Sequence, residues 1–222
     1  PFVNKTDLLR VHGFKRRRKE VGGDNELRIM AQSCVKGSVF ACPPADRLAE
    51  ARVIIATPET VGTLKALELF RKGDFTHIIV DESSQSLEPE TLIAFSLAEA
   101  GKTEMVLSGD PFQLSAATMS AEARARGLST SLQERLMCDQ SKPYVRMDSR
   151  FIACLTVSFR AHPALLDLPN RLYYSGRLRT GLDSESIAKM EDCWGDKFRL
   201  PSKGFPLVLY AHQGVDEHPL DS

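Results

Sequence analysis

The sequence lacks an excess of charge of either sign. Lys and Arg together number 29, as do Asp and Glu, so the formal net charge of the 222 residues is zero. No global positive field therefore points to a polyanionic partner. The one dense basic run is KRRRK at residues 15–19. This pattern fits either a solvated turn or a contact with a phosphate backbone.

Cysteine pairs and long apolar runs are also missing. The five cysteines are scattered along the chain: Cys34, Cys42, Cys138, Cys154 and Cys193. None forms a CxxC pair or a Cys/His cluster with zinc spacing, and this distribution is typical of a reducing compartment. No apolar run approaches the ~18 residues of a membrane span, so we expect no membrane partner. The chain opens with Pro1 rather than with an initiator residue or a secretory signal, and we expect it to be an excerpt of a longer protein.

Short apolar runs alternate with amphipathic patterns in the first two thirds of the chain. The runs predict strands at 52–57, 76–81 and 104–110, and the patterns between and after them predict helices at 58–72, 87–100 and 127–137. The helix at 87–100 should bury a stripe formed by Leu92, Ile93, Leu97 and Ala100. Continuous apolar strands that alternate with helices predict an α/β fold, with a parallel sheet covered by helices on both faces.

A polar stretch at 138–150 predicts a junction between two domains. We therefore divide the chain into residues 1–140 and 141–222. The second part should contain strands within 151–160 and 205–212, with a helix over 162–176 between them. Pro169 should break or kink that helix, because proline lacks a backbone N–H and its ring clashes with the preceding turn.

Two adjacent acids, Asp81 and Glu82, follow the apolar strand at 76–80. Parallel strands joined by a right-handed crossover open onto the same edge of the sheet, where ligands of α/β proteins bind. Asp81 could hold Mg²⁺ there, and Glu82 could orient or deprotonate a water that attacks a phosphate. The alternative is an ordinary loop that happens to carry two acids.

Two further stretches fit the same chemistry. LSGDPFQL at 107–114 ends the next strand, where the amide of Gln113 could bond a γ-phosphate oxygen; the alternative is a simple Gly-Asp-Pro turn. In SFRAHP at 158–163, Arg160 could stabilise charge on a transferring phosphoryl group and Phe159 could stack on a base. The alternatives for this pair are a solvent-facing arginine and a core phenylalanine.

Taken together, these motifs are much more specific than any one of them. VDESSQSLEPE, LSGDPFQL and SFRAHPALLDLPNRLYYSGRL, with RVIIATPETVG and GLSTSLQERL, resemble superfamily 1B RNA helicases of the nonsense-mediated-decay helicase group. Within that group they look most like the Armitage and Moloney-virus-resistance type, and the resemblance covers most of residues 50–182. It implies two RecA-like domains, each a parallel sheet flanked by helices, with ATP in the cleft between them. Only the start of the second domain would be present.

The resemblance implies roles for the residues of the first domain. Asp81 would be the magnesium-binding acid and Glu82 the water-activating acid, with Gln85 close to the same site. Gln113 would be the γ-phosphate sensor. Gly109 and Asp110, in the same motif, would belong to the nucleotide-binding site.

Other positions are assigned by the same resemblance. Arg160 would act as an arginine finger from the second domain, and Phe159 stands where an aromatic residue commonly stacks on adenine. Thr57, with Pro58 beside it, would contact the nucleic-acid backbone. His162 and Pro163 belong to the finger motif, and we expect a structural role for them.

The implied activity is ATP- and Mg²⁺-dependent translocation on single-stranded RNA, 5′ to 3′, with unwinding or remodelling of RNA–protein complexes in RNA silencing. We expect a cytoplasmic location, which includes ribonucleoprotein granules, with the nucleus as the alternative. The sequence contains no GxxxxGK loop followed by Ser or Thr, so we expect this central segment to be inactive on its own. Two other interpretations stay open: a DNA helicase of superfamily 1, and an inactive RNA-binding scaffold that kept the helicase folds.

Overall fold

In this computed structural model, the structure describes residues 7–13, 34–138, 148–192, 206–208, 211 and 213–214. The chain divides into two compact units, Pro1–Phe151 and Ile152–Ser222. The basic run at 15–19, Cys193 and half of the strand predicted at 205–212 lie outside the described residues.

The first unit contains short strands that pair mainly in parallel: β1 (Leu8–Arg10), β2 (Val35–Lys36), β3 (Val39–Phe40), β4 (Val53–Ile55), β5 (His77–Val80) and β6 (Glu104–Leu107). β1 pairs in parallel with β4, and β5 in parallel with β6, while β2 and β3 form an antiparallel hairpin. The predicted strands at 52–57, 76–81 and 104–110 are thus confirmed, and so is the α/β class. Among the described residues, however, β4 pairs with β1 and not with β5.

The helices of the first unit follow the strands: α2 (Ala45–Glu50), α3 (Pro58–Ala66), the 3₁₀ turn η3 (Ser83–Gln85), α4 (Glu88–Phe95), α5 (Ala121–Ala125) and α6 (Leu132–Cys138). Two of them end earlier than predicted. α3 stops at Ala66, and Glu68 just beyond it adopts a left-handed conformation with φ 58°. α4 stops at Phe95, where the Ser96 hydroxyl donates to the carbonyl of Ile93 at 2.6 Å and so competes with the helical backbone.

The core of the first unit lies between β1, α2, α3 and the segments that follow α3 and α4. Its buried residues are Leu9, Val11, Leu48, Leu64, Phe70 and Leu97. Burying each such side chain stabilises the fold by about 1.5–3 kcal/mol. The rings of Phe70 and Phe75 meet edge to face, with their centroids 5.1 Å apart. This core positions the amino-terminal end of the β5–β6 pair.

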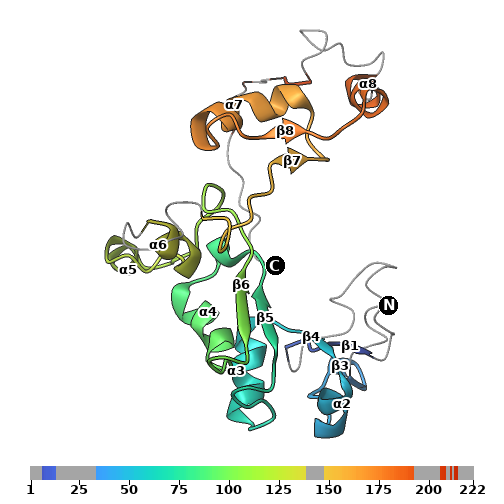
Figure 1. Cartoon of the computed structure of the whole chain (residues 1–222), viewed down its shortest axis with the longest axis vertical. Coiled ribbons are helices and arrows are strands. Elements are labelled where there is room, and N and C mark those ends of the chain that lie inside the picture. The colour runs from blue at the N-terminus through green and yellow to red at the C-terminus, as the bar shows by residue number, and fades with distance from the viewer. Residues whose placement is uncertain are drawn as a thin grey trace. The chain divides into compact units, whose positions relative to one another are not determined.

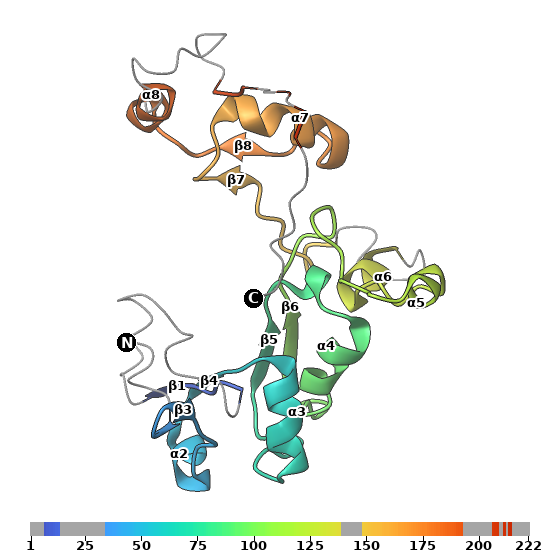
Figure 2. The ribbon, with the colours of Figure 1, turned by 180° about the vertical axis from the view of Figure 1, so that it is seen from behind.

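Only one face of the β5–β6 pair is covered by the described residues. α3 and α4 lie on the same side of the pair (Figures 1 and 2). Ile79 and Val106 lie opposite each other in the register and share the other face, where Ile79 is more than half exposed and Val106 is 43% exposed, so the prediction that helices cover both faces is not met. The predicted stripe on α4 is also partly wrong, because Leu92 is exposed whereas Thr91 and Ala94 are buried.

The second unit consists of β7 (Val157–Ser158), α7 (Pro163–Tyr173), β8 (Arg179–Thr180) and α8 (Ser184–Asp192). β7 and β8 pair in parallel across the α7 crossover. α7 continues through Pro169, so the predicted break does not occur. The next residue, Asn170, anchors the helix to the chain before β8, because its amide bonds both the N–H and the C=O of Leu178 at 2.8 Å. Within the described part of the chain, no helix combines the length and apolarity that crossing a membrane requires.

Candidate functional site

The parallel register of β5 and β6 brings two loops to one edge of the first unit. Val80 lies opposite Leu107 at the carboxyl ends of the strands. The N–H of Ser108 donates to Val80 O at 2.9 Å, and the N–H of Ser83 donates to Ser108 O at 2.8 Å. The ladder therefore continues past the strands into the loop that carries Asp81 and Glu82. We call residues 81–85 the acidic loop and residues 108–113 the sensor loop.

Asp81 and Glu82 are both exposed at this edge. The hydroxyl of Ser108 donates to Asp81 Oδ1 at 3.0 Å, which ties the carboxylate to the sensor loop. Ser108 was not among the predicted site residues. A serine directly after an apolar strand, opposite an acid after the neighbouring strand, is the signal that could have found it.

Glu82 adopts a left-handed conformation, with φ 51° and ψ 37°. A residue other than glycine in this region is strained by about 1–3 kcal/mol, and such strain is concentrated at functional sites. The side-chain amide of Gln85 donates to Glu82 Oε2 at 3.0 Å. The structure thus places Gln85 beside the acidic pair, where it hydrogen-bonds one oxygen of the Glu82 carboxylate.

The sensor loop is organised by Asp110. Its carboxylate accepts from the backbone N–H of Phe112 at 3.0 Å and from the side-chain amide of Gln113 at 2.9 Å. Asp110 therefore shapes the turn, as aspartate commonly does. The Gln113 amide group carries two N–H donors. One serves Asp110, and the second is the group that could reach a phosphate oxygen.

Gly109 lies where a side chain would not fit. A Cβ built there would stand 2.6 Å from Gln133 Oε1, 3.0 Å from the backbone N of Ser84 and 3.1 Å from that of Ser83. The glycine in the GDP turn is therefore required by the close approach of the two loops. Its φ is not in the left-handed region, so the reason is steric space.

One contact between the loops was missed entirely at the sequence level. The hydroxyl of Ser83 donates to Gln133 Oε1 at 2.7 Å, and Gln133 Nε2 donates to the carbonyl of Gly109 at 3.1 Å. Gln133 lies on α6, far along the chain from both loops. No local signal announces the contact, although a polar residue directly after the buried Leu132 is a weak indication.

Thr57 and Pro58 do not join this site. They follow β4, which pairs with β1. The Thr57 hydroxyl caps α3 by accepting from Thr60 N at 3.4 Å, and Pro58 occupies the first turn. The side chain of Thr57 is exposed. In the structure Thr57 thus caps α3, and Pro58 begins it.

Arg160 and Phe159 belong to the second unit. Both side chains are exposed, and the Phe159 side chain is 74% accessible, which excludes the alternative of a core phenylalanine. One part of the Phe159 ring lies against Gly181, because a Cβ at Gly181 would stand 2.5 Å from its Cε1. The backbone N–H of Arg160 contacts Ser158 Oγ at 3.5 Å.

His162, in the same motif, is buried and structural, in line with the role expected for it. Its side chain accepts from the N–H of Ala164 at 3.2 Å and so caps α7. Its other ring nitrogen, Nε2, lies 3.2 Å from Glu191 Oε1 on α8. Because Nδ1 accepts, Nε2 carries the proton and donates to Glu191.

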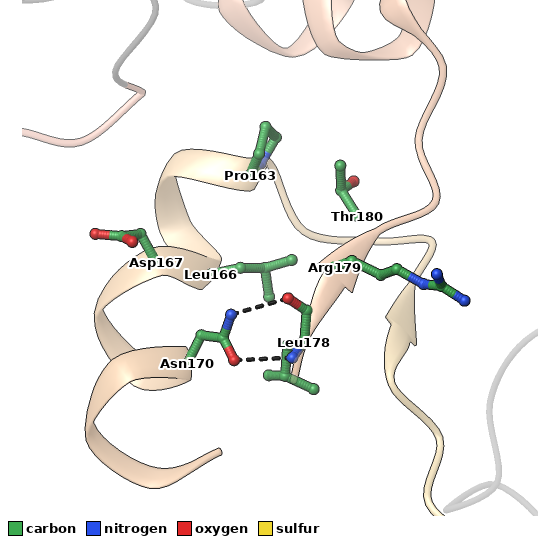
Figure 3. A pocket seen from close by; sticks show the side chains of 7 residues that line it. All are labelled: Pro163, Leu166, Asp167, Asn170, Leu178, Arg179 and Thr180. Carbon is green, nitrogen blue, oxygen red and sulfur yellow. Dashed lines mark hydrogen bonds between the residues drawn. The ribbon is translucent and has the colours of Figure 1, made fainter. Parts of the chain in front are cut away.

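A cavity of about 150 Å³ opens between α7 and β8 in the second unit (Figure 3). Its lining residues are Pro163, Leu166, Asp167, Asn170, Leu178, Arg179 and Thr180. Asn170 is occupied by its two bonds to Leu178 (Figure 3). None of the predicted nucleotide-binding residues lines this cavity.

The donor set at the acidic loop fits Mg²⁺ in the way nucleotide enzymes use it. Within the described ranges, no cluster of three or more His, Cys, Asp or Glu side chains could hold a metal ion by itself. Mg²⁺ usually takes only one or two carboxylates from a protein and completes its shell with waters and phosphate oxygens. An exposed Asp81, hydrogen-bonded through one oxygen, meets that requirement.

α6, the helix that carries Gln133, is joined to α4 by an ion pair. Arg135 donates twice to the carboxylate of Glu88 on α4, at 2.7 and 2.6 Å. These hydrogen bonds lower the pKa of Glu88 below its ordinary value. Burial opposes this effect and the charge of Arg135 adds to it, but both contributions are smaller. Bidentate Arg–carboxylate pairs are directional, so this pair fixes the orientation of α6 as well as its position.

Comparison with known proteins identifies the family. Residues 9–121 match the family described as AAA domain. Helicase mov-10-B.2 of Danio rerio is 33% identical over 225 residues, which cover 99% of this chain and 21% of that protein. RNA helicase Mov10l1 of Mus musculus is 37% identical over 179 residues, covering 76% and 14%. The helicase with zinc finger domain of Homo sapiens is 36% identical over 141 residues, covering 64% and 7%.

The chain spans about a fifth or less of the length of these curated relatives. The match to the AAA domain takes in the acidic loop and the sensor loop and extends over slightly more than half of the chain. The chain therefore belongs to the AAA-domain family and, among the superfamily 1 helicases, to the Mov10 type.

Proposed function

We propose that this chain is the central part of an ATP-dependent RNA helicase that hydrolyses ATP between two RecA-like domains. Residues 1–140 would belong to the first of these domains and residues 141–222 would begin the second. The observation that carries the proposal is the shared edge of β5 and β6, where Asp81, Glu82 and Gln113 lie on two adjoining loops. Acids and an amide on neighbouring strand ends are among the groups that nucleoside triphosphate hydrolysis uses.

Each group has a distinct proposed task. Asp81 would hold Mg²⁺, which when bound neutralises charge on the phosphates of ATP. Glu82 would take a proton from the attacking water, while Gln113 would donate a hydrogen bond to the γ-phosphate. Gly109 and Asp110 shape the loop that presents Gln113.

The second unit would complete the site. Arg160 would stabilise charge on the transferring phosphoryl group, and Phe159 would stack on the adenine. The exposure of both side chains supports this proposal, because each must project from the surface of its own unit to reach a ligand. Closing and opening of the two domains would then move the protein along single-stranded RNA, 5′ to 3′, with Thr57 and Pro58 near the RNA backbone.

RNA is proposed over DNA because relatives such as Mov10l1 are named RNA helicases. The residues of the site bind nucleotide and backbone, which do not by themselves select a sugar; contacts to the 2′-OH do so. We propose a cytoplasmic location and a role in remodelling RNA–protein complexes during RNA silencing.

The test uses Glu82→Gln in the full-length protein that contains these residues. We expect wild-type protein to hydrolyse ATP when single-stranded RNA is added. The variant should hydrolyse ATP about 10²–10⁴-fold more slowly while still binding RNA. The isolated 222 residues should show negligible turnover. Wild-type hydrolysis stimulated by DNA alone would favour a DNA helicase. RNA remodelling that survives Glu82→Gln unchanged would favour a non-hydrolysing scaffold.

A further inference from the structure

Gln133 connects the acidic loop to the sensor loop through a single side chain. Its Oε1 accepts from the hydroxyl of Ser83 at 2.7 Å, and its Nε2 donates to the carbonyl of Gly109 at 3.1 Å. A primary amide is the only uncharged side-chain group that offers a carbonyl acceptor and two N–H donors together. Leucine would offer neither function, and glutamate would lose the donor.

The bridge continues to Asp81, the acid proposed to hold Mg²⁺. Besides Gln133, the Ser83 hydroxyl lies within hydrogen-bonding distance of Ser108 O at 3.0 Å, which the backbone N–H of Ser83 also contacts. The hydroxyl of Ser108 in turn donates to Asp81 Oδ1. Gln133 is thus three hydrogen-bonded steps from the carboxylate proposed to hold Mg²⁺. Ser83 is fully buried, so water does not replace the bridge without a rearrangement of the loops.

α6 presents this amide from a fixed position. Leu132, directly before Gln133, is buried, and Ser131 before it is fully buried and accepts from the N–H of Glu134 at 3.1 Å. Two residues further along α6, Arg135 is held by two hydrogen bonds to Glu88. A side chain held on a packed helix positions its partners more accurately than one on a loop.

We propose that Gln133 is a positioning residue that holds the acidic loop and the sensor loop in register for hydrolysis of the nucleoside triphosphate. The inference rests on the proposed function of these loops, and it gives a role to a residue of the GLSTSLQERL stretch that had none. Gln133 acts through Ser83 and Gly109, and it touches neither nucleotide nor metal in this arrangement. Partners that orient a ligating carboxylate typically change metal affinity or activity about 10–100-fold when they are removed.

The experiment compares three single variants and one double variant of the full-length protein. Gln133→Leu removes both hydrogen bonds with little change in side-chain size, and Gln133→Glu keeps an acceptor for Ser83 but loses the donor to Gly109. Arg135→Gln separates the bridge from the docking of α6, because it removes the ion pair with Glu88 and keeps the Gln133 amide itself; the pair is partly exposed, so we expect its loss to change the Mg²⁺ dependence less than Gln133→Leu does. ATP hydrolysis with RNA is measured as kcat and KM across a series of Mg²⁺ concentrations. Amide hydrogen exchange is measured at Ser83.

We expect Gln133→Leu to lower kcat about 10–100-fold, to raise the Mg²⁺ concentration needed for half of the maximal rate, and to accelerate exchange at Ser83. The KM for ATP should change less than kcat. Gln133→Glu should fall between Gln133→Leu and wild type in exchange at Ser83. Ser83→Ala combined with Gln133→Leu should be no worse than Gln133→Leu alone, because both changes remove the same bridge.

Two results would overturn the inference. One is a Gln133→Leu protein whose kcat, Mg²⁺ dependence and Ser83 exchange match wild type. The other is an Arg135→Gln protein with the same Mg²⁺ shift as Gln133→Leu, because the effect would then belong to the docking of α6. If the wild-type protein shows no ATP hydrolysis, the proposed function fails. Exchange at Ser83 then decides alone whether the bridge holds the loops.

Discussion

The candidate groups of the two units are held very differently. In the first unit, Asp81, Glu82 and Gln113 each receive a hydrogen bond from, or give one to, a neighbouring side chain. In the second unit, Phe159 and Arg160 stand exposed, and Arg160 contacts Ser158 through its backbone N–H. The first unit is therefore organised before any ligand arrives. The second offers side chains that can turn to a ligand or to another part of the protein.

The largest effect should come from the exposed arginine of the second unit. We expect Arg160→Ala in the full-length protein to lower RNA-stimulated ATP hydrolysis by about 10³-fold or more, because an arginine finger supplies transition-state stabilisation of that size. Thermal stability should stay unchanged, since the side chain is exposed. Kinetics of ATP hydrolysis and a melting curve check both parts.

Arg177→Ala is the matched control for this change. Arg177 is also an exposed arginine of the second unit, and its Nε donates to the carbonyl of Tyr174 at 3.1 Å. We expect it to leave hydrolysis within a few-fold of wild type. Equal rates for the two variants would remove Arg160 from the reaction, and with it the idea that the second unit contributes an exposed cation.

In the first unit, the contact between the two loops is disrupted most directly at Gly109. We expect Gly109→Ala to destabilise the first unit by about 1–3 kcal/mol, because the new methyl group would overlap two backbone nitrogens and the Gln133 amide. Urea unfolding followed by circular dichroism measures the change. Gly13→Ala is the control, since nothing lies within 4 Å of a Cβ at that position. A Gly109→Ala protein as stable as the control would show that the two loops have room to separate.

The sequence predicted the strands and the edge, because those features depend on local patterns. Apolar runs bounded by acids, serine or glycine specify β5 and β6, and the handedness of a βαβ crossover then brings their ends together. The acids follow β5 directly, the GDP turn follows β6, and in the second unit Arg160 follows β7. Their placement follows from position along the chain.

The remaining features depend on contacts between distant residues, which periodicity does not encode. β4 pairs with β1, and the sequence near Leu9 carries no clear strand pattern. α4 ends at Phe95 because a serine hydroxyl competes for a carbonyl. Gln133 reaches the loops from 24 and 50 residues away. A single sequence shows each of these residues but not its partner.

The second unit has its own organised element, at His162, and breaking it should have an intermediate effect. His162→Ala removes the cap of α7 and leaves Glu191 without the imidazole donor. We expect a loss of about 1–2 kcal/mol from the stability of the second unit. The exposed His77 serves as the control, and His77→Ala should cost less than about 1 kcal/mol. Hydrogen exchange in α7 distinguishes the two, and equal protection of α7 in both variants would contradict the capping role.

The smallest expected effect concerns the ion pair that fixes α6. Hydrogen bonds from Arg135 lower the pKa of Glu88, so the ionised carboxylate stabilises the folded state. That contribution is fully present above the pKa that Glu88 has in the unfolded chain, and it is lost as the pH falls through the lower, folded value. Because the pair is partly exposed to solvent, we expect Glu88→Gln to cost less than about 1 kcal/mol at neutral pH.

This prediction is checked by urea unfolding of wild type and Glu88→Gln from neutral to acidic pH. The two stability curves should lie apart at neutral pH and converge in acid, because protonated Glu88 no longer differs in charge from glutamine. Glu122→Gln is the control, since Glu122 pairs with Arg126 within one helical turn and both side chains are exposed. Curves for Glu88→Gln and wild type that separate further in acid would reverse the sign of the linkage. The ion pair would then not be what fixes α6, and the position of Gln133 between the two loops would depend on the buried Leu132 and Ser131 alone.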